Sequence, residues 1–165
     1  MRHINSDELI EIAIKIENDG YHYYSKMAER ANDPELTRLF SYLASEEKKH
    51  AKDFISLKEQ IGHTEIKIPE IYESPDIALY LEALVDGKVF WTNLSVDDIL
   101  DEIESEEQAV KHAISFEKDS VLFYNDILDL AILDKKDVSL IREMIKQEKI
   151  HISKLLMLLA KFQPR

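Results

Sequence analysis

Cysteine is absent from this chain of 165 residues. Without cysteine, the chain can form no disulfide, thiolate zinc site, iron–sulfur centre or cysteine nucleophile. Any metal ion that it binds must therefore be held by oxygen and nitrogen atoms. The chain also has no apolar run near the roughly 18 residues that cross a membrane, and its first residues lack the apolar stretch of a secretion signal. We therefore expect no membrane partner and a cytoplasmic location.

Glycine and proline are scarce, at three and four residues, while 33% of the chain is charged. Glu, Lys, Leu, Ile and Ala are abundant, and this composition favours helices over sheets. The length suits one domain covering residues 1–165. Basic residues are outnumbered, and the net charge of −12 leaves no basic stripe for a phosphate backbone. The sequence thus predicts an all-α protein without a nucleic-acid partner.

Apolar residues recur at helical spacing in four long stretches. Two short breaks make each pair of stretches an antiparallel hairpin, and a crossover over residues 62–105 joins the pairs. We expect two short helices inside the crossover, over about 76–85 and 96–103. The long helices are predicted over about 6–32, 34–61, 106–133 and 137–162.

Capping residues mark three of the helix starts. Asn5 with Glu8, and Ser105 with Gln108, have the spacing of a capping box. Asp33 precedes a proline, which is tolerated in the first turn of a helix because its missing N–H needs no partner there. These signals support the predicted starts of the first, second and third long helices.

A constellation of one glutamate followed about thirty residues later by Glu-x-x-His occurs twice. A shift of one hundred residues aligns the first glutamates, and a shift of one hundred and one aligns the Glu-x-x-His motifs. In each helix these residues fall on the apolar stripe that faces the bundle core. The two copies are Glu17, Glu47 and His50, and Glu117, Glu148 and His151.

Four glutamates buried together would repel one another and lose hydration, at several kcal/mol per ion. Two divalent cations would cancel their charge, and two neutral imidazoles would complete the ligand set. The i, i+3 spacing in Glu-x-x-His places both side chains on one helix face. One such motif alone is usually a solvated surface feature. Two copies on core positions predict a dinuclear metal site, for which we expect two iron ions; manganese remains an alternative, and zinc could substitute.

Small and aromatic residues follow each lone glutamate. Gly20 and Ser120 lie one turn further along, where they could open a pocket for dioxygen or peroxide or simply permit close helix packing. Tyr24 and Tyr124 lie two turns further along. Their hydroxyls could point to the ligand carboxylates, or their rings could fill the core.

At these residues the chain resembles the rubrerythrin group of the ferritin-like superfamily, whose members are di-iron carboxylate proteins. The resemblance covers the long helices, and it implies a ferritin-like four-helix bundle. It also implies that the six repeated Glu and His residues are iron ligands, with Glu47 and Glu148 as bridging carboxylates. Tyr24 and Tyr124 look like the tyrosines that lie next to the metal ligands in this family.

The chain departs from the rubrerythrin pattern in two ways. Rubrerythrins add a rubredoxin module with four cysteines, so a chain without cysteine would need a separate electron donor, such as a rubredoxin-type protein. Rubrerythrins also carry an additional glutamate, which changes ligation with redox state, where this chain has Ser120. This difference argues against peroxide reduction by that particular ligand change.

The expected function is therefore that of a di-iron oxidoreductase that reduces peroxide or dioxygen with electrons from outside, as in oxidative-stress defence. Two alternatives remain open on the sequence: ferritin-like oxidation and storage of iron, and a nonenzymatic helical interaction domain with a structural metal site. A homodimer is compatible with each of them.

Overall fold

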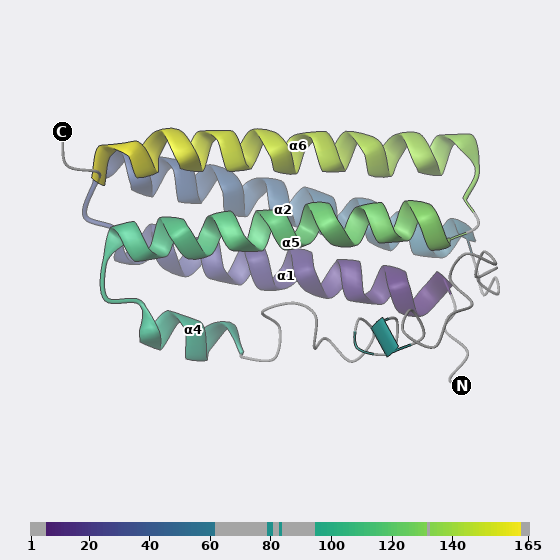
Figure 1. Ribbon diagram of the computed structural model, residues 1–165, viewed down its shortest axis with the longest axis horizontal. Coiled ribbons are helices and arrows are strands. Elements are labelled where there is room, and N and C mark those ends of the chain that lie inside the picture. The colour runs from purple at the N-terminus through teal and green to yellow at the C-terminus, as the bar shows by residue number, and fades with distance from the viewer. Residues whose placement is uncertain (1–5, 62–78, 81–82, 84–94, 132, 163–165) are drawn as a thin grey trace.

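The computed structural model describes residues 6–61, 79–80, 83, 95–131 and 133–162. This part of the chain is helical and contains no strand (Figure 1). The predicted all-α class is thereby confirmed. The elements are α1 Ser6–Arg30, α2 Pro34–Ile61, α4 Val96–Glu102, α5 Glu106–Leu130, α6 Lys135–Leu159 and the short 3₁₀ helix η3 Ala160–Phe162.

The four long helices lie side by side in a bundle (Figure 1). α1 packs on α2, and α5 packs on α6, so each helix pair predicted as a hairpin forms one. The hairpins meet through α1 with α5 and through α2 with α6. α2 and α6 therefore make one side of the bundle, and α1 and α5 make the opposite side. α4 packs against α1 on that second side.

Two helix starts behave as the sequence predicts. Asp33 Oδ1 accepts hydrogen bonds from the backbone N–H groups of Glu35 and Leu36, at 2.7 and 3.3 Å. Ser105 Oγ accepts one from the N–H of Gln108 at 3.1 Å. The side chain of Gln108 accepts a hydrogen bond from the N–H of Glu104. The predicted capping box would have used the N–H of Ser105 instead. The Asn5 cap and the short helix over 76–85 fall outside or largely outside the described residues.

The start of α6 differs from the prediction. Asp134 caps this helix, because its Oδ1 accepts from the N–H groups of Lys136 and Asp137 at 2.7 and 2.8 Å. The helix therefore begins two residues before the predicted position and changes to η3 near its end. α1 and α5 end two and three residues before their predicted ends. α4 confirms the second short helix of the crossover and begins with a capping box between Ser95 and Asp98.

The apolar core is divided into two clusters. One contains Leu9, Phe54 and Ile127 near one end of the bundle, and the other contains Phe40, Val110 and Leu158 near the other end. A belt of buried polar side chains lies between them along the helices. Because both clusters exclude water, the polar belt is held in an environment of low dielectric constant.

None of the described helices is long and apolar enough to span a membrane.

Candidate metal centre

The six repeated residues meet in the middle of the bundle, although they come from four helices. None is more than 4% exposed. α1 and α5 each supply one glutamate, while α2 and α6 each supply a glutamate and a histidine. The structure thus brings together all the predicted ligand residues, which are Glu17, Glu47, His50, Glu117, Glu148 and His151.

Two groups of four residues in this cluster have ligand atoms that lie within 4.8 Å of one another. Glu17 and His50 belong to the first group, and Glu117 and His151 belong to the second. Glu47 and Glu148 belong to both groups. The cluster is therefore compatible with two adjacent metal ions that share two carboxylates.

Buried ligand atoms that form no hydrogen bond support this interpretation. Two buried carboxylate oxygens, Glu17 Oε2 and Glu47 Oε1, form no hydrogen bond among the described residues, and they lie 3.5 and 3.7 Å from Nδ1 of His50 and of His151. A buried polar atom without a partner costs about 1–3 kcal/mol, and a charged one costs more. Metal ions placed among these atoms would satisfy them together. The residues therefore fit a di-metal centre.

Both imidazoles present Nδ1 to the carboxylates. His50 Nδ1 lies 2.8 Å from Glu148 Oε1, and His151 Nδ1 lies 2.9 Å from Glu148 Oε2. On its far side, His50 Nε2 lies 2.8 Å from Oε1 of Gln147. A carbonyl oxygen can only accept, so Nε2–H donates to it, and a lone pair of Nδ1 faces the cluster once Nδ1 has lost its own proton. Gln147 thus fixes the tautomer that a metal ligand requires.

Without metal, protons on the two histidines offset the negative charge of the buried carboxylates. Burial opposes the charge of both imidazoles, yet the adjacent carboxylates of Glu148 and Glu17 raise the pKa of His50 to about 11. For His151, burial again lowers the pKa, but the carboxylates of Glu117 and Glu148 outweigh burial and raise the pKa to about 9. Both imidazoles are therefore protonated at neutral pH in the absence of metal.

The glutamates differ in the direction of their pKa shifts. Burial first, and the nearby carboxylates of Glu17 and Glu148 second, raise the pKa of Glu47 well above its usual range. Burial and Glu148 raise the pKa of Glu117. For Glu148, hydrogen bonds from Glu117, His151 and His50 outweigh burial and lower the pKa. Glu148 is consequently the anion between two imidazolium groups.

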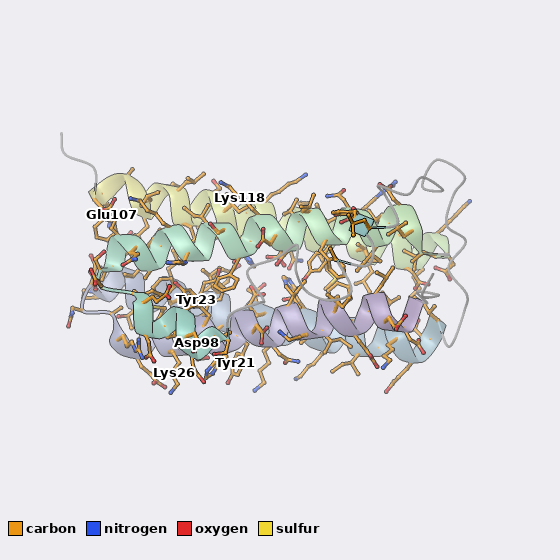
Figure 2. All side chains as sticks on the ribbon, turned by 60° about the horizontal axis from the view of Figure 1, so that its bottom comes forward. Tyr21, Tyr23, Lys26, Asp98, Glu107 and Lys118 are labelled. Atoms are coloured by element: carbon orange, nitrogen blue, oxygen red, sulfur yellow. The ribbon has the colours of Figure 1, made fainter. Side chains whose placement is uncertain are left out.

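Tyr24 and Tyr124 cross the bundle to opposite halves of the cluster. Tyr24 donates its hydroxyl to Glu117 Oε1 at 2.5 Å, and Tyr124 donates its hydroxyl to Glu17 Oε1. Each lone glutamate is thereby oriented by the tyrosine of the other repeat. Tyr23 is buried beside Tyr24 and donates to the carbonyl oxygen of Ala109 at 2.7 Å, which ties α1 to α5 (Figure 2).

Gly20 leaves space for one of the shared carboxylates. A Cβ at this position would lie 3.2 Å from Glu47 Oε2 and 3.3 Å from its Cγ, closer than side chains usually approach. Ser120 occupies the corresponding position of the second repeat, is 4% exposed, and donates to the carbonyl oxygen of Phe116 at 3.1 Å. The small size of Gly20 therefore serves the placement of Glu47.

The family model for rubrerythrin matches residues 8–159. The chain belongs to the rubrerythrin family. A crystal structure of a ferritin-like diiron-carboxylate protein from Thermotoga maritima superimposes with a TM-score of 0.70, over 99% of each chain, at 23% identity. This likeness confirms the ferritin-like helical bundle fold. No curated protein sequence matches the chain.

Two residues beside the cluster of this rubrerythrin-family chain were not predicted from the sequence. Gln147 precedes Glu148 and looks like an ordinary polar residue at the edge of a helix stripe. Tyr42 packs edge-on against the ring of His151, with ring centroids 5.9 Å apart. Neither residue recurs in the other repeat, where Glu46 and Glu143 stand at the aligned positions. Repetition, which identified the other residues, could not have revealed these two.

Replacing Gln147 with alanine is expected to weaken metal binding by about 10–100-fold, because His50 would lose the bond that fixes its tautomer. Isothermal titration of the metal-free protein with Mn²⁺ or Zn²⁺ measures the change. Gln60→Ala, at an exposed position of α2, serves as the control and should bind like the unaltered protein. Equal affinities for all three proteins would show that Gln147 does not orient His50.

Proposed function

We propose that this member of the rubrerythrin family is a di-iron oxidoreductase that reduces peroxide or dioxygen with electrons from an external donor. The observation that carries this proposal is the sharing of Glu47 and Glu148 by two groups of ligand atoms. Two iron ions held so closely would supply, when reduced, the two electrons that a peroxide consumes. The mixed oxygen and nitrogen donor set suits iron, and also manganese.

The ligand roles follow from the two groups. Glu17 and His50 would hold one ion, Glu117 and His151 would hold the other, and the two shared glutamates would lie between them. Four carboxylates match the charge of two divalent ions. The cost of burying these carboxylates is then offset by coordination, which explains why a helical core would retain them.

Two tyrosine hydroxyls stay protonated beside the centre. Burial, with the nearby carboxylates of Glu117 and Glu17, raises the pKa of Tyr24 and Tyr124 well above the usual value. Each hydroxyl therefore keeps its proton and holds it on the oxygen that faces a ligand carboxylate. These weakly acidic hydroxyls therefore act as hydrogen-bond donors that hold Glu117 and Glu17 in place, and not as the acids that supply the two protons of peroxide reduction.

Anaerobic loading with Fe²⁺, followed by titration with hydrogen peroxide, tests the proposal. The expected result is an absorbance change complete at about one peroxide per two irons and reversed by added reductant, with a slower change under dioxygen. Glu148→Gln is the matched variant and should not show this stoichiometry. No absorbance change would overturn the proposal. Oxidised iron accumulating far beyond two ions per chain would instead favour iron storage.

A further inference from the structure

Tyr42 connects the solvent to the buried cluster. Tyr42 is 38% exposed, whereas His151, which its ring contacts edge-on, is 1% exposed. The ammonium group of Lys154 lies 4.8 Å from the centre of the Tyr42 ring. No described carboxylate forms an ion pair with Lys154. An exposed aromatic ring with an unpaired cation on it has the composition of a protein-docking anchor.

Charge is divided between the two sides of the bundle. Outside the metal cluster, α2 and α6 together carry eleven Lys and Arg against six Asp and Glu. α1, α4 and α5 together carry five Lys and Arg against fourteen Asp and Glu. The side that contains Tyr42 is therefore electropositive in a chain whose net charge is −12. Figure 2 shows the opposite side, with Asp98 on α4 and Glu107 on α5.

The charge pattern selects among the partners that this side could bind. A second copy docked by twofold symmetry would bring like charges together. A copy docked with its acidic side on the basic side would make a head-to-tail contact, which builds a ring or an open filament and not a twofold dimer. A long polyanion would extend beyond this side toward the acidic residues of α1, α4 and α5, which would repel it. A compact acidic protein suits the local charge without incurring these costs.

We propose that the outward side of α2 and α6 around Tyr42 and Lys154, the Tyr42 face, docks a small acidic protein that donates one electron at a time. The choice of an electron donor rests on the proposed function, because Tyr42 contacts a residue of the centre that must be re-reduced. The second repeat places Glu143 where the first has Tyr42. The repeated halves are thus unequal on this side, and the His151 half is the one that the donor approaches.

The electrons balance with a one-iron donor. Each docking event oxidises one donor iron from Fe²⁺ to Fe³⁺ and delivers one electron to the centre. Two such events restore the two electrons that one peroxide takes up, and two protons then complete the formation of two waters. No further oxidant or reductant is required.

Binding of a reduced rubredoxin, a small acidic one-iron protein, tests the docking separately from catalysis. The test uses the full chain loaded with redox-inactive Zn²⁺ and compares dissociation constants at low salt. Lys154→Glu is expected to weaken binding about tenfold, with a smaller difference in 0.5 M salt. Lys26→Glu makes the same charge change on the α4 side and is expected to leave binding nearly unchanged (Figure 2). Equal effects of the two variants, or none, would overturn the proposal.

Two further measurements complete the test with iron-loaded protein. Tyr42→Leu should accept electrons from rubredoxin several-fold more slowly even when rubredoxin saturates the protein, while a small neutral reductant reduces both proteins at equal rates. If rubredoxin reduces both proteins equally, electrons do not pass by way of Tyr42.

If Lys154→Glu instead converts a dimer to a monomer in sedimentation and leaves rubredoxin binding intact, the Tyr42 face is a self-association surface. An iron centre inert to peroxide would contradict the proposed function and leave the zinc-form binding result standing.

Discussion

Replacement of Glu148 by glutamine is expected to reduce the bound metal from two ions per chain to at most one. The same change should lower the free energy of unfolding of the metal-free protein by about 3–5 kcal/mol, the usual cost of removing one partner from a buried charge pair. Glu148 is 0% exposed and approaches the Nδ1 atoms of His50 and His151 at 2.8 and 2.9 Å. Without its charge, the two imidazolium groups would lose their common anion.

Metal analysis after dialysis and urea unfolding measures these two effects. Glu143→Gln is the matched control, since it makes the same chemical change at an exposed position of α6, where the glutamate pairs with Lys146. We expect a change of less than about 1 kcal/mol and full metal content for this control. If Glu148→Gln also keeps two ions, Glu148 does not bridge them.

Metal binding at pH 7 is expected to release between two and four protons per pair of ions. His50 and His151, with pKa values of about 11 and 9, carry protons in the metal-free protein and must lose them to coordinate through Nδ1. The raised pKa values of Glu47 and Glu117 add up to two more protons. Calorimetric titrations in two buffers of different ionisation enthalpy give this number, and release of no protons would contradict the pKa shifts.

The same shifts set the pH dependence of stability without metal. Because the folded-state pKa values of the two histidines are raised, their protonation stabilises the fold fully below the usual value near 6.5. That contribution is lost as the pH rises through about 9 and then about 11. The metal-free protein should therefore melt at a lower temperature at pH 10 than at pH 7. The zinc-loaded protein should show a smaller decrease, because its histidines are already neutral.

The sequence was sufficient to predict the fold because local and global signals agree. The apolar stripe of each helix places Glu17 and Glu117 among core positions, and Asp33 and Ser105 mark helix starts with their side-chain bonds. Both signals act over a few residues, so they can be recognised without coordinates. The start of α6 was predicted less well, because Asp134 was not recognised as its N-terminal cap.

The arrangement around the cluster could not be predicted in the same way. Gln147 and Tyr42 act across the contact between α2 and α6, and that contact depends on how the two hairpins dock. The place of Gly20 beside Glu47 likewise depends on the separation of α1 and α2. Such contacts join residues that are distant in the sequence and have no periodic pattern. Repetition revealed the symmetric ligands, and the structure revealed how the two halves differ.

The central claim is that Glu47 and Glu148 lie between two metal ions, each of which has one histidine ligand. Anomalous diffraction at the iron edge from crystals of the iron-loaded protein tests it most directly. The account predicts two peaks about 3.5–4 Å apart, the spacing of two-metal sites, with His50 at one and His151 at the other and both shared glutamates in contact with each. A single peak, or two peaks that do not share Glu47 and Glu148, would contradict it.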